Sequence, residues 1–174
     1  GTIEQEAVHG DLLAFAHATP RPVVMLSALE EAEDEEADPD LAGSRLLAAR
    51  ALRRPGVGPP PILVAAVHAL QQRLPDPDAA DAATRTLALN SELALEALVA
   101  GLAGAGYARA AEVAEKGTFA VRGGILDVWP PTAALPLRAE FSGDTVASLR
   151  RFDPASQTSV ERIGYHRAFP QHCS

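Results

Sequence analysis

The sequence predicts an α/β protein in which a partial parallel α/β unit is followed by an α+β module with a mainly antiparallel sheet. Two short apolar runs, at 23–26 and 62–67, are typical of buried parallel strands, and a helical pattern follows each of them. Beyond residue 107 the pattern changes to alternating apolar and polar residues with two-residue turn signals between them. That change predicts antiparallel hairpins in the second half of the chain.

The first part of the chain is expected to alternate strands with helices. Apolar residues spaced three to four apart predict helices at 3–18, 41–54 and 68–74. Asp40 precedes the second of these helices and is expected to cap it, because a short acceptor side chain satisfies free N–H groups there. Residues 76–85 are small and polar, which predicts a linker.

The second part is expected to begin with one helix and continue as strands. The helix is predicted at 91–105, with Ser91 as its cap and one apolar stripe made of Leu95, Leu98, Val99 and Leu102. Strands are predicted at 118–122, 125–129, 137–141 and 146–152.

Together these patterns divide the chain into three parts. We expect the partial α/β domain to occupy residues 1–77 and the α+β module to occupy 78–165. Residues 166–174 are expected to form a return segment or a tail.

The negative charge of the chain is concentrated in one place. The formal net charge is −8, from 15 basic and 23 acidic residues, and eight of the acids lie between Glu30 and Asp40. The remaining chain is balanced, so a strongly basic nucleic-acid-binding surface is disfavoured. The acidic run lacks the spacing of a calcium loop, and a solvated surface loop is favoured over a cation site.

Several other classes of protein are disfavoured by the sequence. No apolar run is long enough to span a bilayer, and the first residues lack the basic region of a secretory signal. The single cysteine, Cys173, permits no internal disulfide, and a reducing, cytoplasmic setting is expected. The histidines have no ligand-like spacing, and the single lysine, Lys116, is not part of a phosphate-binding loop. We therefore expect no metal, no cofactor and no catalytic site.

One segment carries a specific motif. It reads Lys116-Gly-Thr-Phe-Ala-Val-Arg-Gly-Gly-Ile-Leu-Asp-Val-Trp-Pro, then Leu137-Arg-Ala-Glu-Phe-Ser-Gly-Asp, then Ser148-Leu-Arg, Phe152-Asp-Pro and Gln157-Thr-Ser. This segment resembles the UvrB-homology module of bacterial transcription-repair coupling factors and, more distantly, domain 2 of UvrB. Upstream, 41–46 and 62–75 resemble the RecA-like half-domain, without ATPase function, that precedes the module in that family.

The resemblance implies a protein-binding role. In this family the module binds UvrA, the damage-recognition ATPase of nucleotide excision repair, through two arginines and an aromatic residue. On the motif these positions fall on Arg122, Arg138 and Ser142, so a serine stands at the usual aromatic position. Contacts with RNA polymerase and DNA are expected only through the rest of a longer parent protein, which would recruit repair to stalled RNA polymerase.

The strand pattern points to the same arginines independently. Alternation along 137–141 places Arg138 and Glu140 on the face opposite the apolar residues, and alternation along 118–122 turns Arg122 outward. Guanidinium groups are suited to bidentate contacts with carboxylates across an interface. The alternative is that Arg138 pairs with Glu140 or with another surface acid.

The roles of two further residues, Trp129 and Asp127, are less specific. Trp129 is expected to anchor the core, and an exposed binding hot spot is the alternative. Asp127 is expected to be a satisfied polar group at the edge of the sheet. For the whole chain, the alternatives to a coupling-factor region are the UvrA-binding region of the UvrB helicase and an autonomous nucleotide- or nucleic-acid-binding domain.

Overall fold

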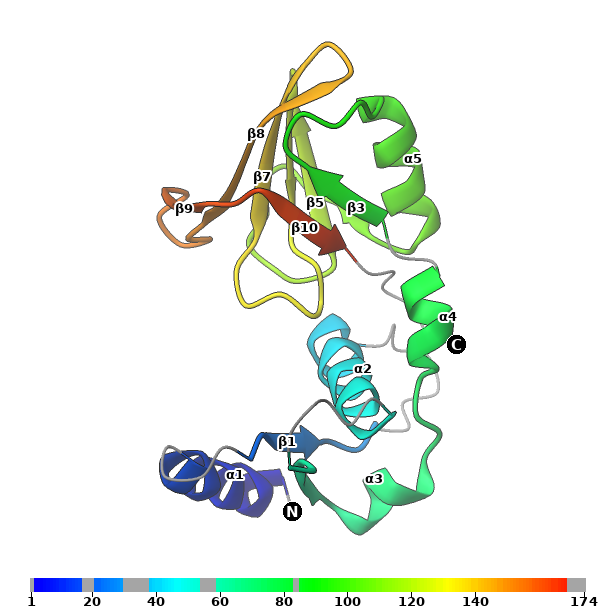
Figure 1. Ribbon diagram of the computed structural model, residues 1–174, viewed down its shortest axis with the longest axis vertical. Coiled ribbons are helices and arrows are strands. Elements are labelled where there is room, and N and C mark those ends of the chain that lie inside the picture. The colour runs from blue at the N-terminus through cyan, green and yellow to red at the C-terminus, as the bar shows by residue number, and fades with distance from the viewer. Residues whose placement is uncertain (1, 17–20, 30–37, 54–58, 83–84, 169–174) are drawn as a thin grey trace. The chain divides into compact units, whose positions relative to one another are not determined.

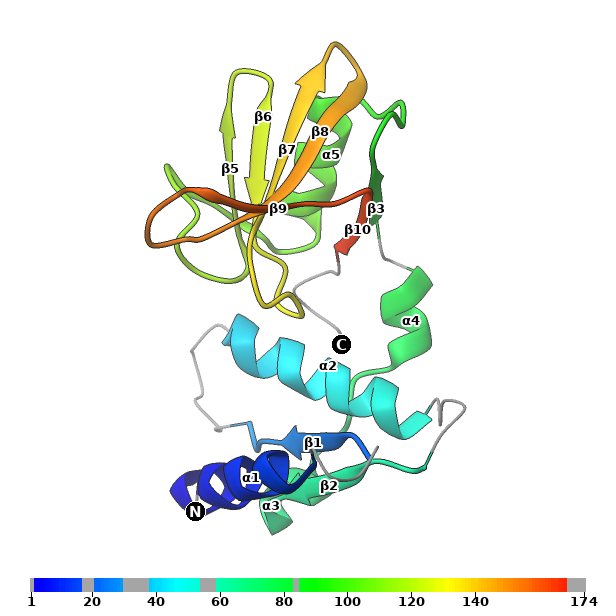
Figure 2. The same ribbon diagram turned by 60° about the vertical axis from the view of Figure 1, so that its left-hand side comes forward.

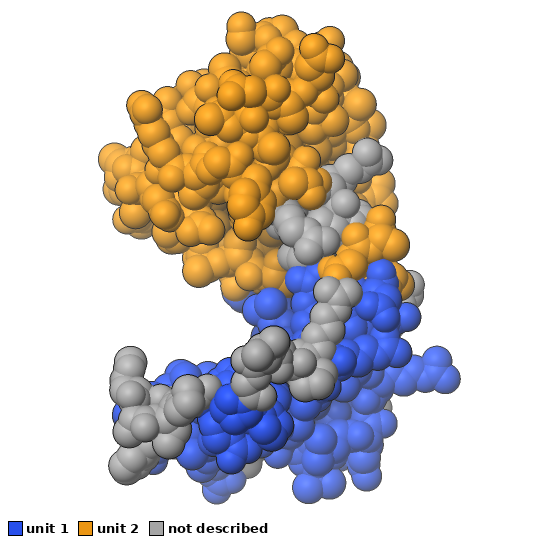
Figure 3. All heavy atoms as spheres, viewed as in Figure 1, with its two compact units in different colours: residues 1–78, 174 blue, residues 79–173 orange. Residues whose placement is uncertain are grey.

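The computed structural model describes residues 2–16, 21–29, 38–53, 59–82 and 85–168. The chain divides into two compact units, which we call unit 1 (up to Asp78) and unit 2 (from Ala79 onward), drawn in blue and orange in Figure 3. Among the described residues no helix has the length and apolar character needed to cross a bilayer.

Unit 1 is a small parallel α/β unit, as the sequence predicted. Its elements are α1 (Thr2–Ala16), β1 (Val23–Leu26), α2 (Pro39–Arg53), β2 (Ile62–Ala65), α3 (Val67–Gln71) and the start of α4 (Pro77–Ala82) (Figure 1). Strands β1 and β2 pair in parallel, with Val23 opposite Ile62 and Leu26 opposite Ala65. Among the described residues, one buried cluster of this unit contains Leu26, Ala48 and Ala69, and the short alanine side chains allow α2 and α3 to pack closely against it.

The ends of several predicted elements differ from the structure, and the helix predicted at 68–74 is α3, which ends at Gln71. Helix α2 is capped by Asp38, whose Oδ1 accepts the Asp40 N–H at 2.9 Å, while Asp40 lies inside the first turn. Pro39 at the first helical position explains the shift, because its fixed φ suits that position and its missing N–H is not needed there. Strand β2 ends at Ala65, and the predicted linker at 76–85 instead contains α4 and the start of the next strand.

A buried arginine holds the segment that follows β1. Arg45 is 2% exposed and donates to the carbonyl oxygens of Ser27 and Arg73 and to Gln72 Oε1, at 2.5, 2.9 and 3.3 Å. The Gln72 amide completes the contact by bonding both the N–H and the carbonyl of Leu29. Burial lowers the pKa of Arg45.

Replacing Arg45 by alanine is expected to destabilise unit 1 by about 2–4 kcal/mol, because a cavity forms and polar groups lose their donor. Urea unfolding followed by far-ultraviolet circular dichroism measures the loss. The matched control is Arg53→Ala, since Arg53 forms a solvent-exposed ion pair with Asp76 whose loss is expected to cost at most about 1 kcal/mol. Equal effects of the two substitutions would contradict the role given to Arg45.

Unit 2 is an α+β unit built on a six-stranded sheet. Its strands in spatial order are β4 (Ala108–Arg109), β5 (Thr118–Arg122), β6 (Ile125–Val128), β7 (Leu137–Ser142), β8 (Thr145–Phe152) and β9 (Ser159–Arg162). All neighbours pair antiparallel except β4 and β5, which are parallel. The mainly antiparallel sheet predicted from the alternation pattern is confirmed.

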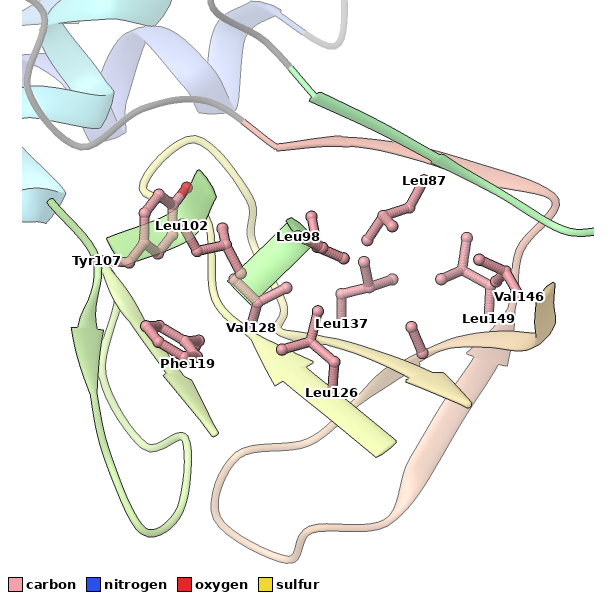
Figure 4. Close-up of a cluster of buried hydrophobic side chains, with 11 residues drawn as sticks. Leu87, Leu98, Leu102, Tyr107, Phe119, Leu126, Val128, Leu137, Val146 and Leu149 are labelled. Carbon is pink, nitrogen blue, oxygen red and sulfur yellow. The ribbon is translucent and has the colours of Figure 1, made fainter. Parts of the chain in front are cut away.

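One face of this sheet is covered by α5 (Leu95–Gly104) and by a separate pair of strands, β3 (Arg85–Ala88) and β10 (Tyr165–Ala168) (Figures 1 and 2). Figure 4 shows the apolar side chains gathered between them. The fully buried members are Leu87, Leu98, Leu102, Tyr107, Phe119, Leu126, Val128, Leu137, Ala139, Val146 and Leu149. The predicted stripe of the helix is confirmed, because Leu98 and Leu102 are buried and Leu95 and Val99 pack against the same cluster.

The start of α5 and the pair β3–β10 were not predicted correctly. The helix begins at Leu95, and the Ser91 hydroxyl donates to the carbonyl of Ala88 instead of capping it. The segment 89–93 is held elsewhere, because Asn90 N–H bonds the Val146 carbonyl and Leu93 N–H bonds the Asp144 carbonyl. Strand β3 was missed because its antiparallel partner lies near the other end of unit 2, where local pattern gives no signal.

Strand β10 contributes a partly buried histidine, His166. Burial and the nearby charge of Arg151 lower the pKa of His166 from 6.5 to about 4. Its buried Nε2 has no hydrogen-bond partner among the described residues. The folded unit therefore holds His166 in its neutral form at neutral pH.

This histidine predicts an acid-sensitive stability of unit 2. Between pH 6.5 and about 4 the unfolded chain binds a proton on His166 that the folded chain does not bind, so stability falls as pH decreases through that window. The expected slope is at most about 1.4 kcal/mol per pH unit, the value for a difference of one bound proton. Urea unfolding at pH 7.0 and 5.5, followed by Trp129 fluorescence, measures it. A His166→Gln variant that keeps the whole slope would show that another group is responsible.

Candidate partner-binding site

The second face of the six-stranded sheet carries a group of charged and polar side chains over β5 to β8, beside the small apolar cluster of Val113, Ala120 and Phe152. Because paired residues on neighbouring strands point to the same side, Asp127, Arg138 and Arg150 form one row across the sheet. Alternation along each strand adds the remaining members. We call this the polar face and define it by Arg122, Asp127, Arg138, Glu140, Ser142 and Arg150.

A buried carboxylate lies at the centre of the polar face. Asp127 is 1% exposed, and its Oδ1 accepts Arg138 Nε at 2.7 Å. Its Oδ2 accepts two N–H groups, from Arg138 Nη2 and from Arg122 Nη2, each at 2.8 Å. Asp127 is thus satisfied, as expected, but the expected location at the sheet edge is wrong, since β6 lies between β5 and β7.

The side chain of Arg138 contacts Asp127, Gln157 and Phe152. It donates two hydrogen bonds to Asp127, from Nε and Nη2. Its Nη1 donates to the backbone oxygen of Gln157 at 3.3 Å, and its Nη2 also donates to Gln157 Oε1 at 3.1 Å. Its guanidinium carbon lies 4.5 Å from the centre of the Phe152 ring, a cation–π distance. The bond to Asp127 raises the pKa of Arg138 despite partial burial. The arginine therefore stays charged and has 18% of its side chain exposed.

Glu140 is not the partner of Arg138. Its carboxylate lies 3.1 Å from Arg150 Nη2, and this ion pair is partly exposed. The sequence left open whether Arg138 would pair with Glu140 or with another acid. The structure assigns it to Asp127, which reaches Arg138 directly across the β6–β7 register.

Arg122 is the exposed arginine of the polar face. It ends β5, and 51% of its side chain is exposed. Among the described residues its guanidinium bonds Asp127 through Nη2 alone. The turn after it is tight: Gly123 has φ +58°, and a Cβ on Gly124 would lie 3.0 Å from the Phe141 carbonyl oxygen. The glycines thus let the turn between β5 and β6 approach the end of β7 closely.

Ser142 ends β7 on the same side of the sheet. It is exposed, and it follows Phe141, whose N–H bonds the Gly124 carbonyl at 2.7 Å. The three residues that the sequence singled out therefore lie on one face of the sheet. Arg122 and Ser142 are exposed there, and Arg138 is mostly buried.

Gln157 is part of the sequence motif, but the sequence alone predicted no role for it. Its backbone adopts φ +58°, and its Nε2 donates to the carbonyls of Val113 and Pro154 at 3.3 and 2.9 Å. Together with its two contacts to Arg138, these bonds tie the β8–β9 turn to β7 and to the loop before β5. The one available signal was its fixed place in the motif.

Trp129 packs as a core residue. Its ring lies against the cluster of Val113, Ala120 and Phe152, and its Nε1 donates to the Ala133 carbonyl at 3.1 Å. This contact set favours the core reading over an exposed hot spot.

Most of the acidic run lies outside the residues that the structure describes. Residues 30–37 are not described, nor are His17, His172 and Cys173. Within the described ranges, no group of three or more His, Cys, Asp or Glu side chains is arranged to hold a metal ion.

A comparison with protein families identifies unit 2. The family model for the UvrB interaction domain matches residues 86–173, from β3 through β10. The chain belongs to the UvrB interaction domain family. The arginines, Asp127 and Gln157 all lie inside the matched range, so the polar face is part of a UvrB interaction domain.

Similar proteins cover more of the chain than this domain. The transcription-repair-coupling factor of Mycobacterium bovis is 37% identical over 150 residues, which is 83% of this chain and 12% of that protein. The factor of Bacillus subtilis is 30% identical over 92% of this chain and 13% of its own length. UvrABC system protein B of Thermosipho africanus is 33% identical over 59% of this chain and 15% of its own length. The resemblance to coupling factors is confirmed, and the chain spans about one eighth of the coupling factors it matches.

Proposed function

We propose that this chain is a non-catalytic protein-interaction region that binds UvrA through the polar face of unit 2. The observation that carries the proposal is the pair of arginines, Arg122 and Arg138, fixed on one face by the buried carboxylate of Asp127. Membership of the UvrB interaction domain family supports the choice of partner.

The chemistry of the face suits a protein partner. An exposed guanidinium with free N–H groups binds carboxylates in a planar, two-pronged arrangement. A nucleic acid would instead require many phosphate contacts, and three arginines on this face already share two acids. The polar face is therefore matched to a few acidic side chains on a folded partner.

The larger role belongs to a longer protein. We propose that the parent is a transcription-repair coupling factor, in which this region recruits UvrA and other domains contact RNA polymerase and DNA. The high coverage by coupling factors supports this parent, and the shorter match to UvrABC system protein B keeps the UvrB helicase as the alternative.

A titration with purified UvrA tests the proposal. Immobilised chain is expected to bind UvrA saturably, and Arg122→Ala is expected to weaken binding by about tenfold or more. The matched control is Arg151→Ala, because Arg151 points to the opposite side of the sheet and forms an exposed ion pair with Glu161. Failure of the wild-type chain to bind UvrA would overturn the function, and tight binding of DNA or ATP would favour an autonomous binder.

Ser142 offers a gain-of-function prediction. Replacing the exposed Ser142 by phenylalanine restores the aromatic residue that the family resemblance implies, and its burial against UvrA is expected to tighten binding about tenfold. The same titration measures the change. A Ser156→Phe variant, at an exposed serine in the β8–β9 turn, controls for nonspecific adhesion. An unchanged affinity in Ser142→Phe would remove Ser142 from the binding surface.

A further inference from the structure

We infer that Asp127 is a positioning residue for partner recognition, and that the two arginines it holds have different tasks. Arg122 contacts a carboxylate of the partner, while Arg138 anchors Asp127 and makes little direct contact. This inference rests on the proposed binding of UvrA. It goes further by assigning the roles of three side chains within the polar face.

Asp127 acts through other residues because it is shielded from any partner. Only 1% of its surface is exposed, and three N–H groups occupy its two oxygens. Strand β6 carries it in the middle of the sheet, where the register places it directly opposite Arg138. Its location is thus set by six-stranded pairing and not by a mobile loop.

Arg138 uses four of its five N–H groups for hydrogen bonds inside unit 2. Its Nε, Nη1 and Nη2 atoms all donate to Asp127 or Gln157, and the Phe152 ring covers one side of the guanidinium. Gln157 is in turn held by the carbonyls of Val113 and Pro154. Arg138 is therefore part of the scaffold, and its role is to keep the Asp127 carboxylate in one orientation.

Arg122 has the opposite character. Its side chain is half exposed, and its Nη2 contact to Asp127 leaves Nε and Nη1 without a partner among the described residues. A free arginine on a surface samples many rotamers, and ordering it on binding costs affinity. Because Asp127 holds one end of the guanidinium, this ordering has already taken place before the partner arrives.

A double-mutant cycle in the full 174-residue chain tests the assignment. Arg122→Ala is expected to weaken UvrA binding about thirtyfold, and Asp127→Asn, which removes the charge but keeps the shape, about tenfold. Combining Asp127→Asn with Arg122→Ala is expected to be no weaker than Arg122→Ala alone. If Asp127→Asn costs its full tenfold even without Arg122, the positioning role is wrong.

The matched control lies outside the polar face. Glu161→Gln removes one acid that pairs with Arg151 on the opposite side of the sheet, and its effect on UvrA binding is expected to be below about twofold. A similar loss of affinity in Glu161→Gln and Asp127→Asn would show that net charge, and not the contact between Asp127 and Arg122, sets the affinity.

Two further measurements separate binding from folding. Arg138→Lys keeps the charge but cannot span both carboxylate oxygens, so it is expected to lower the urea midpoint while the folded protein binds UvrA within about threefold of wild type. Nitrogen-15 relaxation of the Arg122 Nε–H in the unbound chain measures directly how far Asp127 restricts the motion of the Arg122 side chain. That group is expected to be rigid in the wild type and mobile in Asp127→Asn.

The outcomes distinguish the two proposals. Absence of UvrA binding by the wild-type chain overturns the function. If the wild-type chain binds UvrA, three results would overturn only the division of roles. These are independent effects of Asp127→Asn and Arg122→Ala in the cycle, a rigid Arg122 side chain in Asp127→Asn, and a thirtyfold loss of affinity in Arg138→Lys.

Discussion

Replacing Asp127 by alanine is expected to destabilise unit 2 by about 3–5 kcal/mol. The change leaves Arg138 as a cation with 18% exposure and no acid within hydrogen-bond distance, while Arg122 loses its contact. A cavity in the centre of the sheet adds to the loss. Urea unfolding followed by Trp129 fluorescence measures it, because Trp129 is the single tryptophan and packs in unit 2.

The comparison variant for this prediction is Glu140→Ala. Glu140 is an acid on the same face whose ion pair with Arg150 is partly exposed, so its removal is expected to cost at most about 1 kcal/mol. A loss below about 1 kcal/mol for Asp127→Ala would mean that water replaces the carboxylate and that the two arginines do not depend on it.

Reversing the charge of Arg122 is expected to weaken UvrA binding about a hundredfold, which corresponds to about 3 kcal/mol. The reason is that Arg122→Glu both removes the exposed guanidinium and opposes a carboxylate of the partner with a like charge. Unit 2 itself is expected to change little in stability, since Arg122 is half exposed and Asp127 keeps its two bonds to Arg138.

Arg151→Glu is the charge-matched control, because Arg151 lies on the other side of β8. Both variants lower the net charge equally, so a difference between them isolates the position of the arginine from the overall field of the protein. Affinity measured at two salt concentrations adds a second readout, because a surface charge contact weakens as salt increases. Equal losses in both variants would remove the polar face from the interface.

The sequence predicted those parts of the structure that depend on neighbouring residues. Alternation along 137–141 separated Leu137 and Ala139 from Arg138 and Glu140, and all four lie as expected, because side chains of a strand point alternately to opposite faces. The parallel pairing of β1 with β2 followed from two continuous apolar runs for a related reason, since strands covered on both faces carry apolar residues throughout.

Helix ends and distant strand pairing were harder to predict. Asp38 and Asp40 are chemically equivalent caps, and Pro39 between them decided the choice. Ser91 also has a capping side chain, but its hydroxyl meets the Ala88 carbonyl instead. Strand β3 has too few residues to show a period, and it exists as a strand because β10 returns beside it.

By itself the sequence determined that Arg122 and Arg138 leave the apolar core on the same side of the sheet. The tertiary structure alone decided that both arginines share Asp127, that Arg138 is enclosed by Phe152 and Gln157, and that Arg122 stays half exposed. The physical reason is that the direction of a side chain follows from its own strand, whereas its partners depend on the order and register of the strands beside it.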